Sequence, residues 1–337
     1  MITEIPAASF DPQNLTPGKH YFRLSFDDRV KDHGYIPVNV LKGHKEGPTL
    51  LILAAVHGDE YEGVQTVIQL LRKLTVQDIR GTLLLVPVAN VSSYFHGSRT
   101  SVIDGGNLAR AFPGKKDGSY TERLAWHLNE ALLDRSDFLL DLHSGGSHYA
   151  IPAMVGYHHR LEDGAPCQSW QAAENFGMPV IWGHEHVPPG RTVSAATEKN
   201  IPWLYTEGYG GKRVRAEEQQ LYEAGALRLM HFLNMLCSPD KWIDKEVSPI
   251  HHRLLGDGNL DKGATAECNG FFIPEVSLLD QVAEGDLIGR IVDWVGQDLQ
   301  LIHAETDGFV MRLRATPLTN KGDGLYTLAS KQPTVMK

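Results

Sequence analysis

The sequence predicts an α/β protein in which a mixed sheet is flanked by helices and followed by a small all-β domain. Two stretches, at 49–56 and 82–88, are almost wholly apolar, as strands buried on both faces of a sheet are. After the first of them, apolar residues recur at helical spacing from residue 61 to residue 74. No long helical period follows residue 239. We therefore expect one domain over 1–239 and a second over 240–337.

The elements follow one another in an alternating order. Strands are expected at 20–27, 35–43, 49–56, 82–88, 138–142, 179–182 and 203–207, and helices at 61–74, through 124–132 and at 216–236. Acidic or amide residues followed by glycine, which are typical of tight turns, punctuate the last hundred residues. These dipeptides are Asp257-Gly258, Asn269-Gly270, Glu284-Gly285, Asp307-Gly308 and Asp323-Gly324.

Charge and composition exclude some classes of function. The 337 residues include 32 Lys and Arg against 41 Asp and Glu, a net charge of −9, which argues against nucleic acid as a partner. No apolar run is long enough to cross a bilayer, and the first residues have no signal-peptide pattern. The three cysteines are widely spaced, which favours reduced thiols. We expect a cytoplasmic protein with no membrane partner.

Two histidines and a glutamate stand where buried strands end. His57 follows the strand at 49–56 in the run His57-Gly58-Asp59-Glu60, and His143 follows the strand at 138–142. Carboxyl ends of parallel strands share one edge of a sheet, which is where open α/β sheets bind ligands. His57, Glu60 and His143 would form a two-histidine, one-carboxylate set, as in zinc peptidases. The alternative is that both histidines only make strand-end hydrogen bonds.

Other polar residues have positions suited to catalysis. Glu207 ends the strand at 203–207, where a carboxylate could move protons; a solvated strand-terminal glutamate is the equal alternative. The long connection at 90–120 supplies Arg99 and Arg110, which suit an oxyanion and a substrate carboxylate, although loop arginines are commonly only solvated. His184 and His186 are interpreted as pocket lining or surface.

Three ordered motifs identify a family resemblance. HGDEYEG, DLHSGG and IPWLYTEGYGG are similar to the metal, third-ligand and catalytic-glutamate segments of the succinylglutamate desuccinylase and aspartoacylase family of zinc-dependent deacylases, relatives of the zinc carboxypeptidases. The resemblance implies a zinc-carboxypeptidase-like fold and one zinc ion per chain on His57, Glu60 and His143. It also implies that Glu207 acts as general base and then as general acid.

The stretch SRTSVIDGGNLARAFPG resembles another segment of the family. The resemblance gives Arg99 the oxyanion-polarising role and makes Arg110 and Asn107 the substrate-binding candidates. One position departs from the family pattern, because Ala109 stands where the family usually has asparagine. This departure leaves strict recognition of an N-acyl amino acid open.

The branch and the second domain are interpreted from similarity too. The strands before the metal motif are most similar to deacetylases that act on N-acetyl-diaminobutyrate. The region after residue 239 resembles a small domain of the lipoyl or biotinyl type, but Glu305-Thr306-Asp307-Gly308 lacks the lysine of a carrier. That absence favours a lid or an oligomer surface over a swinging arm.

The predicted function is hydrolysis of a small N-acyl amino acid or related amide, with the small molecule as partner and a homo-oligomer compatible with the sequence. Two alternatives remain open: a carboxypeptidase-like metallopeptidase, and a zinc-binding protein without turnover. The stretch from 147 to 190 is expected to shape the substrate pocket. Tyr149, Tyr157 and Arg191 are its candidate contacts, each with a core or surface alternative.

Overall fold

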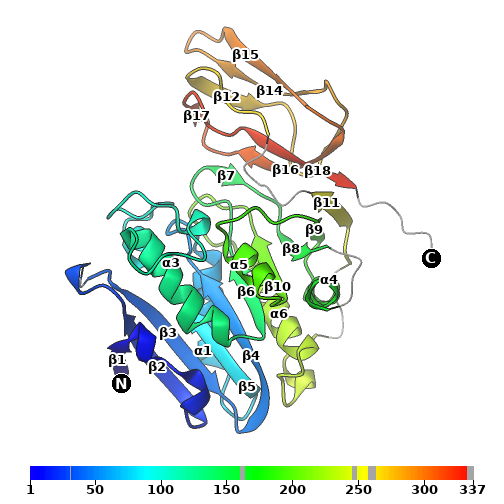
Figure 1. The fold of residues 1–337 in the computed structure, drawn as a ribbon. Helices are drawn as coiled ribbons and strands as arrows, with labels where there is room; N and C mark the ends of the chain where they lie inside the picture. Colours follow the sequence, from blue (N-terminus) through cyan, green and yellow to red (C-terminus); the bar gives the residue numbers. More distant parts are fainter. Residues whose placement is uncertain (31, 160–163, 245–248, 257–262, 332–337) are drawn as a thin grey trace.

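The computed structural model describes residues 1–30, 32–159, 164–244, 249–256 and 263–331. Its larger part is a twisted mixed sheet with helices on both faces (Figure 1). The strands of this part are β1 (Ile2–Pro6), β2 (Gly18–Ser25), β3 (Tyr35–Lys42), β4 (Lys45–Ala54), β5 (Arg80–Val86), β6 (Phe138–Leu142), β8 (Met154–His158), β9 (Val180–His184), β10 (Trp203–Glu207) and β11 (His252–Gly256).

The centre of the sheet is parallel and lies at the middle of the hydrophobic core. The hydrogen-bonded order there is β5-β4-β6-β10, and these strands all run in one direction. Leu51 and Leu53 of β4 face one core cluster, whereas Leu50 and Ile52 face the other. Burial on both faces explains why β4 and β5 have nearly continuous apolar sequences. It also brings the carboxyl ends of β4, β6 and β10 to one edge.

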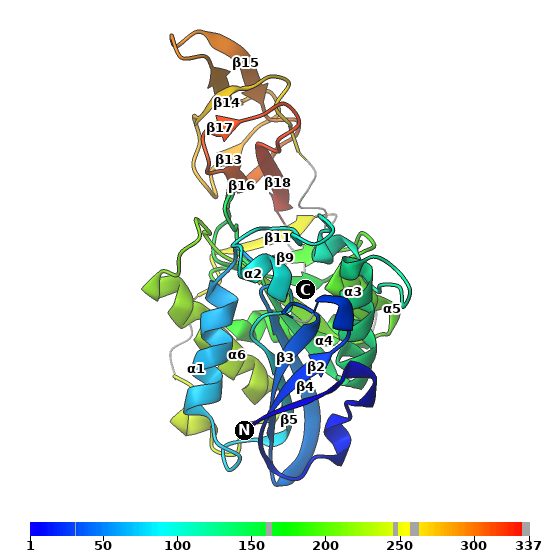
Figure 2. The ribbon, with the colours of Figure 1, turned by 90° about the vertical axis from the view of Figure 1, so that its left-hand side faces the viewer.

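Helices cover both faces of the sheet. Within the described segments the α-helices are α1 (Glu62–Lys73), α2 (Val91–Tyr94), α3 (Tyr120–Ala131), α4 (Ala165–Phe176), α5 (Thr192–Glu198) and α6 (Ala216–Phe232). Residues of α1, α4 and α6 pack into one core cluster and residues of α3 and α5 into the other, in agreement with the two views in Figures 1 and 2. At the start of α3, Ser119 and Glu122 form a reciprocal capping box.

Short 3-10 turns connect several of these elements. They are η1 (Ala7–Ser9), η2 (Pro12–Asn14), η3 (Asp28–Val30), η4 (Leu108–Arg110), η5 (Leu133–Arg135) and η6 (Pro239–Lys241). None of the helices within the described segments combines the length and the apolar content that crossing a membrane requires.

The C-terminal part is an all-β unit at one end of the molecule (Figure 1). Its strands are β12 (Gly270–Pro274), β13 (Gln281–Val282), β14 (Leu287–Val292), β15 (Asp298–His303), β16 (Gly308–Arg314), β17 (Leu318–Thr319) and β18 (Tyr326–Lys331). Four of them form a separate antiparallel sheet in the order β15-β14-β12-β17. Phe272, Ile288, Ile291 and Ile302 lie in a core cluster of its own.

The two parts are joined by hydrogen bonds between strands. β11 lies after residue 239, yet it pairs in parallel with β9 and so extends the larger sheet. On its other side β11 pairs with β18, and the short β7 (Tyr149–Ala150) pairs with β16. This continuity holds β16 against the loops at the carboxyl edge of the larger sheet.

The predicted fold class is confirmed, and the differences concern individual elements. β1, β8, α4 and α5 are additional to the expected elements, and α6 ends at Phe232 rather than at residue 236. Gly285 lies in a turn and Gly308 directly follows a bend, close to the expected turns. The predicted turn at Asp257-Gly258 lies outside the described residues.

Candidate active site

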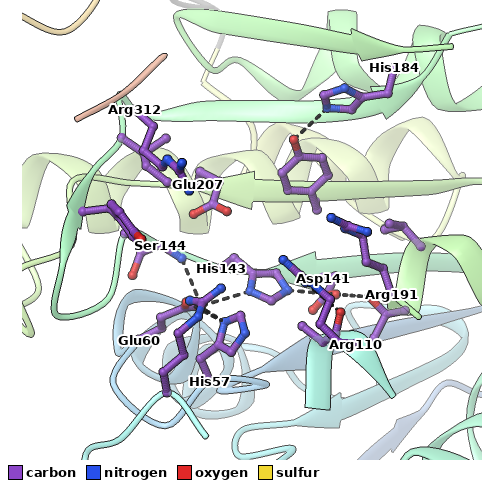
Figure 3. A pocket seen from close by; sticks show the side chains of 18 of the residues that line it. His57, Glu60, Arg110, Asp141, His143, Ser144, His184, Arg191, Glu207 and Arg312 are labelled. Carbon is purple, nitrogen blue, oxygen red and sulfur yellow. Dashed lines mark hydrogen bonds and ion pairs between the residues drawn. The ribbon is translucent and has the colours of Figure 1, made fainter. Parts of the chain in front are cut away.

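His57, Glu60 and His143 lie together at the carboxyl edge of the sheet (Figure 3). β4 and β6 are adjacent parallel strands, so the residues that follow them meet. Glu60 Oε1 lies 2.7 Å from His57 Nδ1, and Glu60 Oε2 lies 3.0 Å from His143 Nδ1. One ligand atom from each residue falls within 4.8 Å of the others. The sequence-predicted trio is therefore brought together.

The outer ring nitrogens of the two histidines are also held. His143 Nε2 lies 3.0 Å from Asp141 Oδ2, and His57 Nε2 lies 3.1 Å from Asn107 Oδ1. The Asp141 and Asn107 oxygens are hydrogen-bond acceptors, so a neutral ring that donates from Nε2 keeps a lone pair on Nδ1 for a metal. The Glu60 oxygens that face Nδ1 are acceptors too, and a cation between them and the two lone pairs would satisfy both. Histidines that bind metals are commonly oriented by such partners.

The charges around the trio favour a cation between them. Burial alone would raise the pKa of Glu60, but the two neighbouring histidines lower it. The balance leaves the pKa of Glu60 far below its usual value. Burial opposes a charge on His143, but Asp141 and Glu60 together hold the pKa of that imidazole well above its usual value. Burial, the largest cause, lowers the pKa of His57, so this ring favours the neutral form that can offer a lone pair to a metal. Two imidazoles and one carboxylate, with both lone pairs directed inward, fit a divalent metal such as zinc.

A glycine makes the first loop possible. A Cβ on Gly58 would lie 2.1 Å from the carbonyl carbon of Ser93. The backbone at residue 58 can therefore lie this close to Ser93 only because residue 58 is glycine. The next residue, Asp59, accepts hydrogen bonds from the backbone N–H and the hydroxyl of Ser147 at 2.8 and 2.6 Å. The loop after β4 is therefore fastened to the loop after β6, which fixes the distance between the two histidines.

Glu207 occupies the end of β10, the strand next to β6. Its side chain is buried, with the residue 6% exposed, and Oε2 has no hydrogen-bond partner among the described residues. Burial, followed by the charge of Glu60, raises the pKa of Glu207 to about 8. A carboxylate with this pKa beside a metal-binding trio is suited to accepting and returning a proton near neutral pH.

The two predicted arginines reach the same cavity. Arg99 Nη1 lies 3.3 Å from His57 Nδ1 and 3.5 Å from Glu60 Oε1, so its guanidinium stands beside the trio. Arg110 lines the cavity, and its Nη1 donates to the carbonyl oxygen of Ala109 at 2.8 Å. Ala109 is itself part of the lining and is 7% exposed.

Asn107 has a different position from the one expected of a substrate contact. It does not line the cavity and instead lines a neighbouring groove with Arg110. Its Oδ1 contacts His57 Nε2 and also accepts the backbone N–H of Ala109 at 3.0 Å, which caps η4. These contacts suit a residue that positions a histidine and a turn.

The cavity, together with its open mouth, contains about 790 Å³ of space that no protein atom occupies. Of the candidate contacts, Tyr149 and Arg191 line it, whereas Tyr157 lies in a core cluster. His184 lines the cavity and His186 is exposed.

Asp141 and Arg312 are two of the lining residues to which the sequence alone gives no role. Asp141, two residues before His143, was visible in the motif but had no assigned role. Arg312 belongs to β16 of the C-terminal unit, and its guanidinium carbon lies 4.4 Å from the centre of the Tyr149 ring. No local motif marks Arg312, because only the packing of β16 against β7 brings it to the cavity.

Comparison with known proteins agrees with this geometry. The succinylglutamate desuccinylase/aspartoacylase catalytic domain model matches residues 46–233. An N-alpha-acetyl-L-2,4-diaminobutyric acid deacetylase of Halomonas elongata is 29% identical over 330 residues, which are 95% of this chain and 93% of that protein.

Two solved structures extend the comparison. The product-bound ectoine utilization protein EutE (DoeB) of Ruegeria pomeroyi is 28% identical, with a TM-score of 0.83 over 94% of this chain and 97% of that one. A succinylglutamate desuccinylase of Silicibacter sp. TM1040 is 26% identical, with a TM-score of 0.81 over 94% of each chain. Since the family model covers more than half of the 337 residues, the chain belongs to the succinylglutamate desuccinylase/aspartoacylase family of deacylases.

Proposed function

We propose that this protein is a zinc-dependent amidohydrolase that removes a small acyl group from an N-acyl amino acid or a related compound. One observation carries the proposal: a buried carboxylate with an unpartnered oxygen, Glu207, shares a cavity with the convergent trio of His57, Glu60 and His143. Such a set contains the groups that amide hydrolysis by water requires.

The trio would hold one zinc ion. His57 and His143 would bind through Nδ1, because their Nε2 atoms contact Asn107 and Asp141. Zinc, when bound, lowers the pKa of a coordinated water to about 7 and polarises a carbonyl group. Asp141 acts here as a positioning residue, since it fixes the ring orientation of His143 and also accepts the hydroxyl of Thr192.

Glu207 would move the proton in both halves of the reaction. Its carboxylate accepts a proton from water as the water oxygen bonds to the amide carbon. The same carboxyl group then donates that proton to the departing nitrogen as the C–N bond breaks. The products are a carboxylate and a free amine, and Glu207 ends in its starting protonation state.

The two arginines would serve opposite ends of the amide. Arg99 stands beside the trio, where its guanidinium can donate hydrogen bonds to the oxyanion that forms from the carbonyl oxygen. Arg110 would bind a carboxylate of the amino-acid half. The methyl side chain of Ala109 offers no hydrogen bond beside Arg110, so recognition of that carboxylate would rest on fewer groups than an asparagine there would provide.

The C-terminal unit would act as a lid over this cavity rather than as a carrier. Arg312 of β16 lines the cavity, and the Thr316 hydroxyl donates to the carbonyl oxygen of Ser147 at 2.9 Å. We further propose a small-molecule substrate as the partner of the site, with N-acetyl-diaminobutyrate first because of the similarity to the Halomonas deacetylase. The proposed location is the cytoplasm.

The test is the release of free amine from a panel of amides. Zinc-loaded protein is incubated with N-acetyl-diaminobutyrate, N-acetyl-aspartate and N-succinyl and N-formyl amino acids, and a dipeptide panel is run beside them. We expect release from one group of N-acyl amino acids and its loss on chelation. Hydrolysis of dipeptides alone would favour a metallopeptidase, and silence on every amide with zinc bound would favour a protein without turnover.

A further inference from the structure

Tyr205 lines the cavity but has no part in the proposed chemistry. It lies two residues before Glu207 on β10, and alternate residues of a strand project from the same face. The side chain is 8% exposed. Its ring therefore forms a wall of the same space in which Glu207 would meet a substrate.

The Tyr205 ring is held in one place by its neighbours. Its hydroxyl forms a 2.7 Å hydrogen bond with His184 Nε2, and the two rings stack at a centroid distance of 5.6 Å and an angle of 21°. Across the sheet, Tyr205 is paired with Gly156 of β8. A Cβ on Gly156 would lie 1.9 Å from Tyr205 Cε1, so the ring lies over a position that only glycine leaves empty. A ring that is bonded to His184 and packed over Gly156 does not yield easily to a larger ligand.

The position of this wall indicates which half of a substrate it faces. His184, the partner of Tyr205, lies on the same side of the cavity as Arg191 and Arg110, whereas Arg312 lies on the opposite side (Figure 3). In the proposed function, on which this step rests, Arg110 binds the carboxylate of the amino-acid half. An amino acid held in this way would lie on the His184 side of the cavity, where Tyr205 forms the wall.

We propose that Tyr205, fixed by His184 and seated over Gly156, is a specificity-determining residue that limits the length of the amino-acid side chain the site accepts. The substrate class that follows is an N-acyl amino acid with a short side chain. Replacing the ring with a smaller side chain opens the space that it fills, and longer side chains then enter.

The experiment compares side-chain length in matched variants. N-acetyl derivatives of alanine, 2-aminobutyrate, norvaline and norleucine are assayed for amine release by the wild type, Tyr205→Ala and Tyr205→Phe. A second series keeps alanine and lengthens the acyl group from acetyl to pentanoyl. Tyr205→Leu accompanies Tyr205→Ala, so that a loss of folding in one variant leaves the comparison intact.

We expect kcat/KM of the wild type to fall for the longest side chains, and Tyr205→Ala to raise kcat/KM for them about tenfold or more relative to N-acetylalanine. Tyr205→Phe should keep the wild-type length profile, since the ring remains. An unchanged profile in Tyr205→Ala and Tyr205→Leu would overturn the proposal. An increase of kcat/KM in these variants for longer acyl groups, rather than for longer amino-acid side chains, would also overturn the proposal.

Binding separates this inference from the proposed function. The same compounds are titrated calorimetrically into zinc-loaded Glu207→Gln, with and without Tyr205→Ala. If the wild type releases no amine from any compound, the proposed function fails, whereas the length dependence of Kd still decides the role of Tyr205. A tenfold shift of Kd toward longer side chains supports it, and identical length profiles refute it.

Discussion

Glu207→Gln is expected to stabilise the metal-free protein while removing its turnover. Glu207 is buried, its Oε2 has no partner among the described residues, and its pKa is raised from 4.5 to about 8. Glutamine has nearly the same shape and carries no charge, so the variant avoids the cost of a buried carboxylate. Function and stability therefore place opposite demands on this position.

The magnitude follows from the pKa of Glu207 in the folded and unfolded chain. Between pH 4.5 and about 8 the folded protein keeps a proton that the unfolded chain releases, so stability falls as pH rises through this window. One pKa unit corresponds to 1.36 kcal/mol, which makes the cost on the order of 3 kcal/mol at pH 7. Relative to the variant, the wild type should lose about 1.4 kcal/mol per pH unit between pH 5.5 and 7.5.

The assay is urea unfolding of both proteins in the presence of a chelator at pH 5.5, 6.5 and 7.5. Tryptophan fluorescence and circular dichroism monitor the unfolding. Glu122→Gln is the control, because Lys115 lowers the pKa of the half-buried Glu122, so the contribution of that carboxylate to stability changes with pH in the opposite direction. A difference in unfolding free energy between wild type and Glu207→Gln that stays constant with pH would contradict this expectation. With zinc and substrate, kcat of the variant should fall about 10²- to 10⁴-fold while zinc stays bound; near-normal turnover would remove Glu207 from its role.

Three further predictions concern the surroundings of the trio. Asp141→Asn should weaken zinc affinity about 10- to 100-fold, because the carboxylate that orients His143 is lost, and competition with a chromogenic chelator measures it; unchanged affinity would contradict the positioning role. Arg110→Ala should raise KM far more for substrates with a carboxylate than for neutral ones, and equal increases would exclude carboxylate binding. Gly58→Ala should lower both the melting temperature and the zinc affinity, because the added Cβ would overlap the backbone of Ser93. A wild-type melting temperature in this variant would show that the loop can move to accept the Cβ.

The convergence of His57, Glu60 and His143 could be predicted from the sequence because its signal is local. His57 and His143 each follow a run of apolar residues that has to be a buried strand, and parallel strands bring such ends together. The same reasoning located Glu207 after β10. Hydrophobic periodicity therefore predicts where the strands end, and the strand ends predict which polar residues meet at the carboxyl edge of the sheet.

The elements missed by the sequence have weak patterns. The buried face of α4 includes Ala172 and Ala173, whose small side chains give little helical periodicity, and β8 is short and contains Gly156. β11 resembles the strands of the C-terminal unit in length and polarity, so only its pairing with β9 assigns it to the larger sheet.

Long-range contacts account for the rest of the site. Arg312 reaches the cavity because β16 packs against β7, and no local spacing reports that contact. Asn107 could be recognised as a functional residue from its motif, but its contact with His57 Nε2 depends on how the 90–120 loop folds over β4. Similarity identified the residue, and the structure describes its contacts.

A zinc titration of activity tests the proposed metal dependence of the hydrolysis directly. Metal-free protein at known concentration receives zinc in steps, and free-amine release from the best substrate of the panel is followed alongside bound metal. We expect no release without metal, a linear rise that saturates at one zinc per chain, and neither zinc binding nor amine release in His143→Ala. Undiminished release in the metal-free protein, or full zinc binding and release in His143→Ala, would contradict the proposed metal dependence.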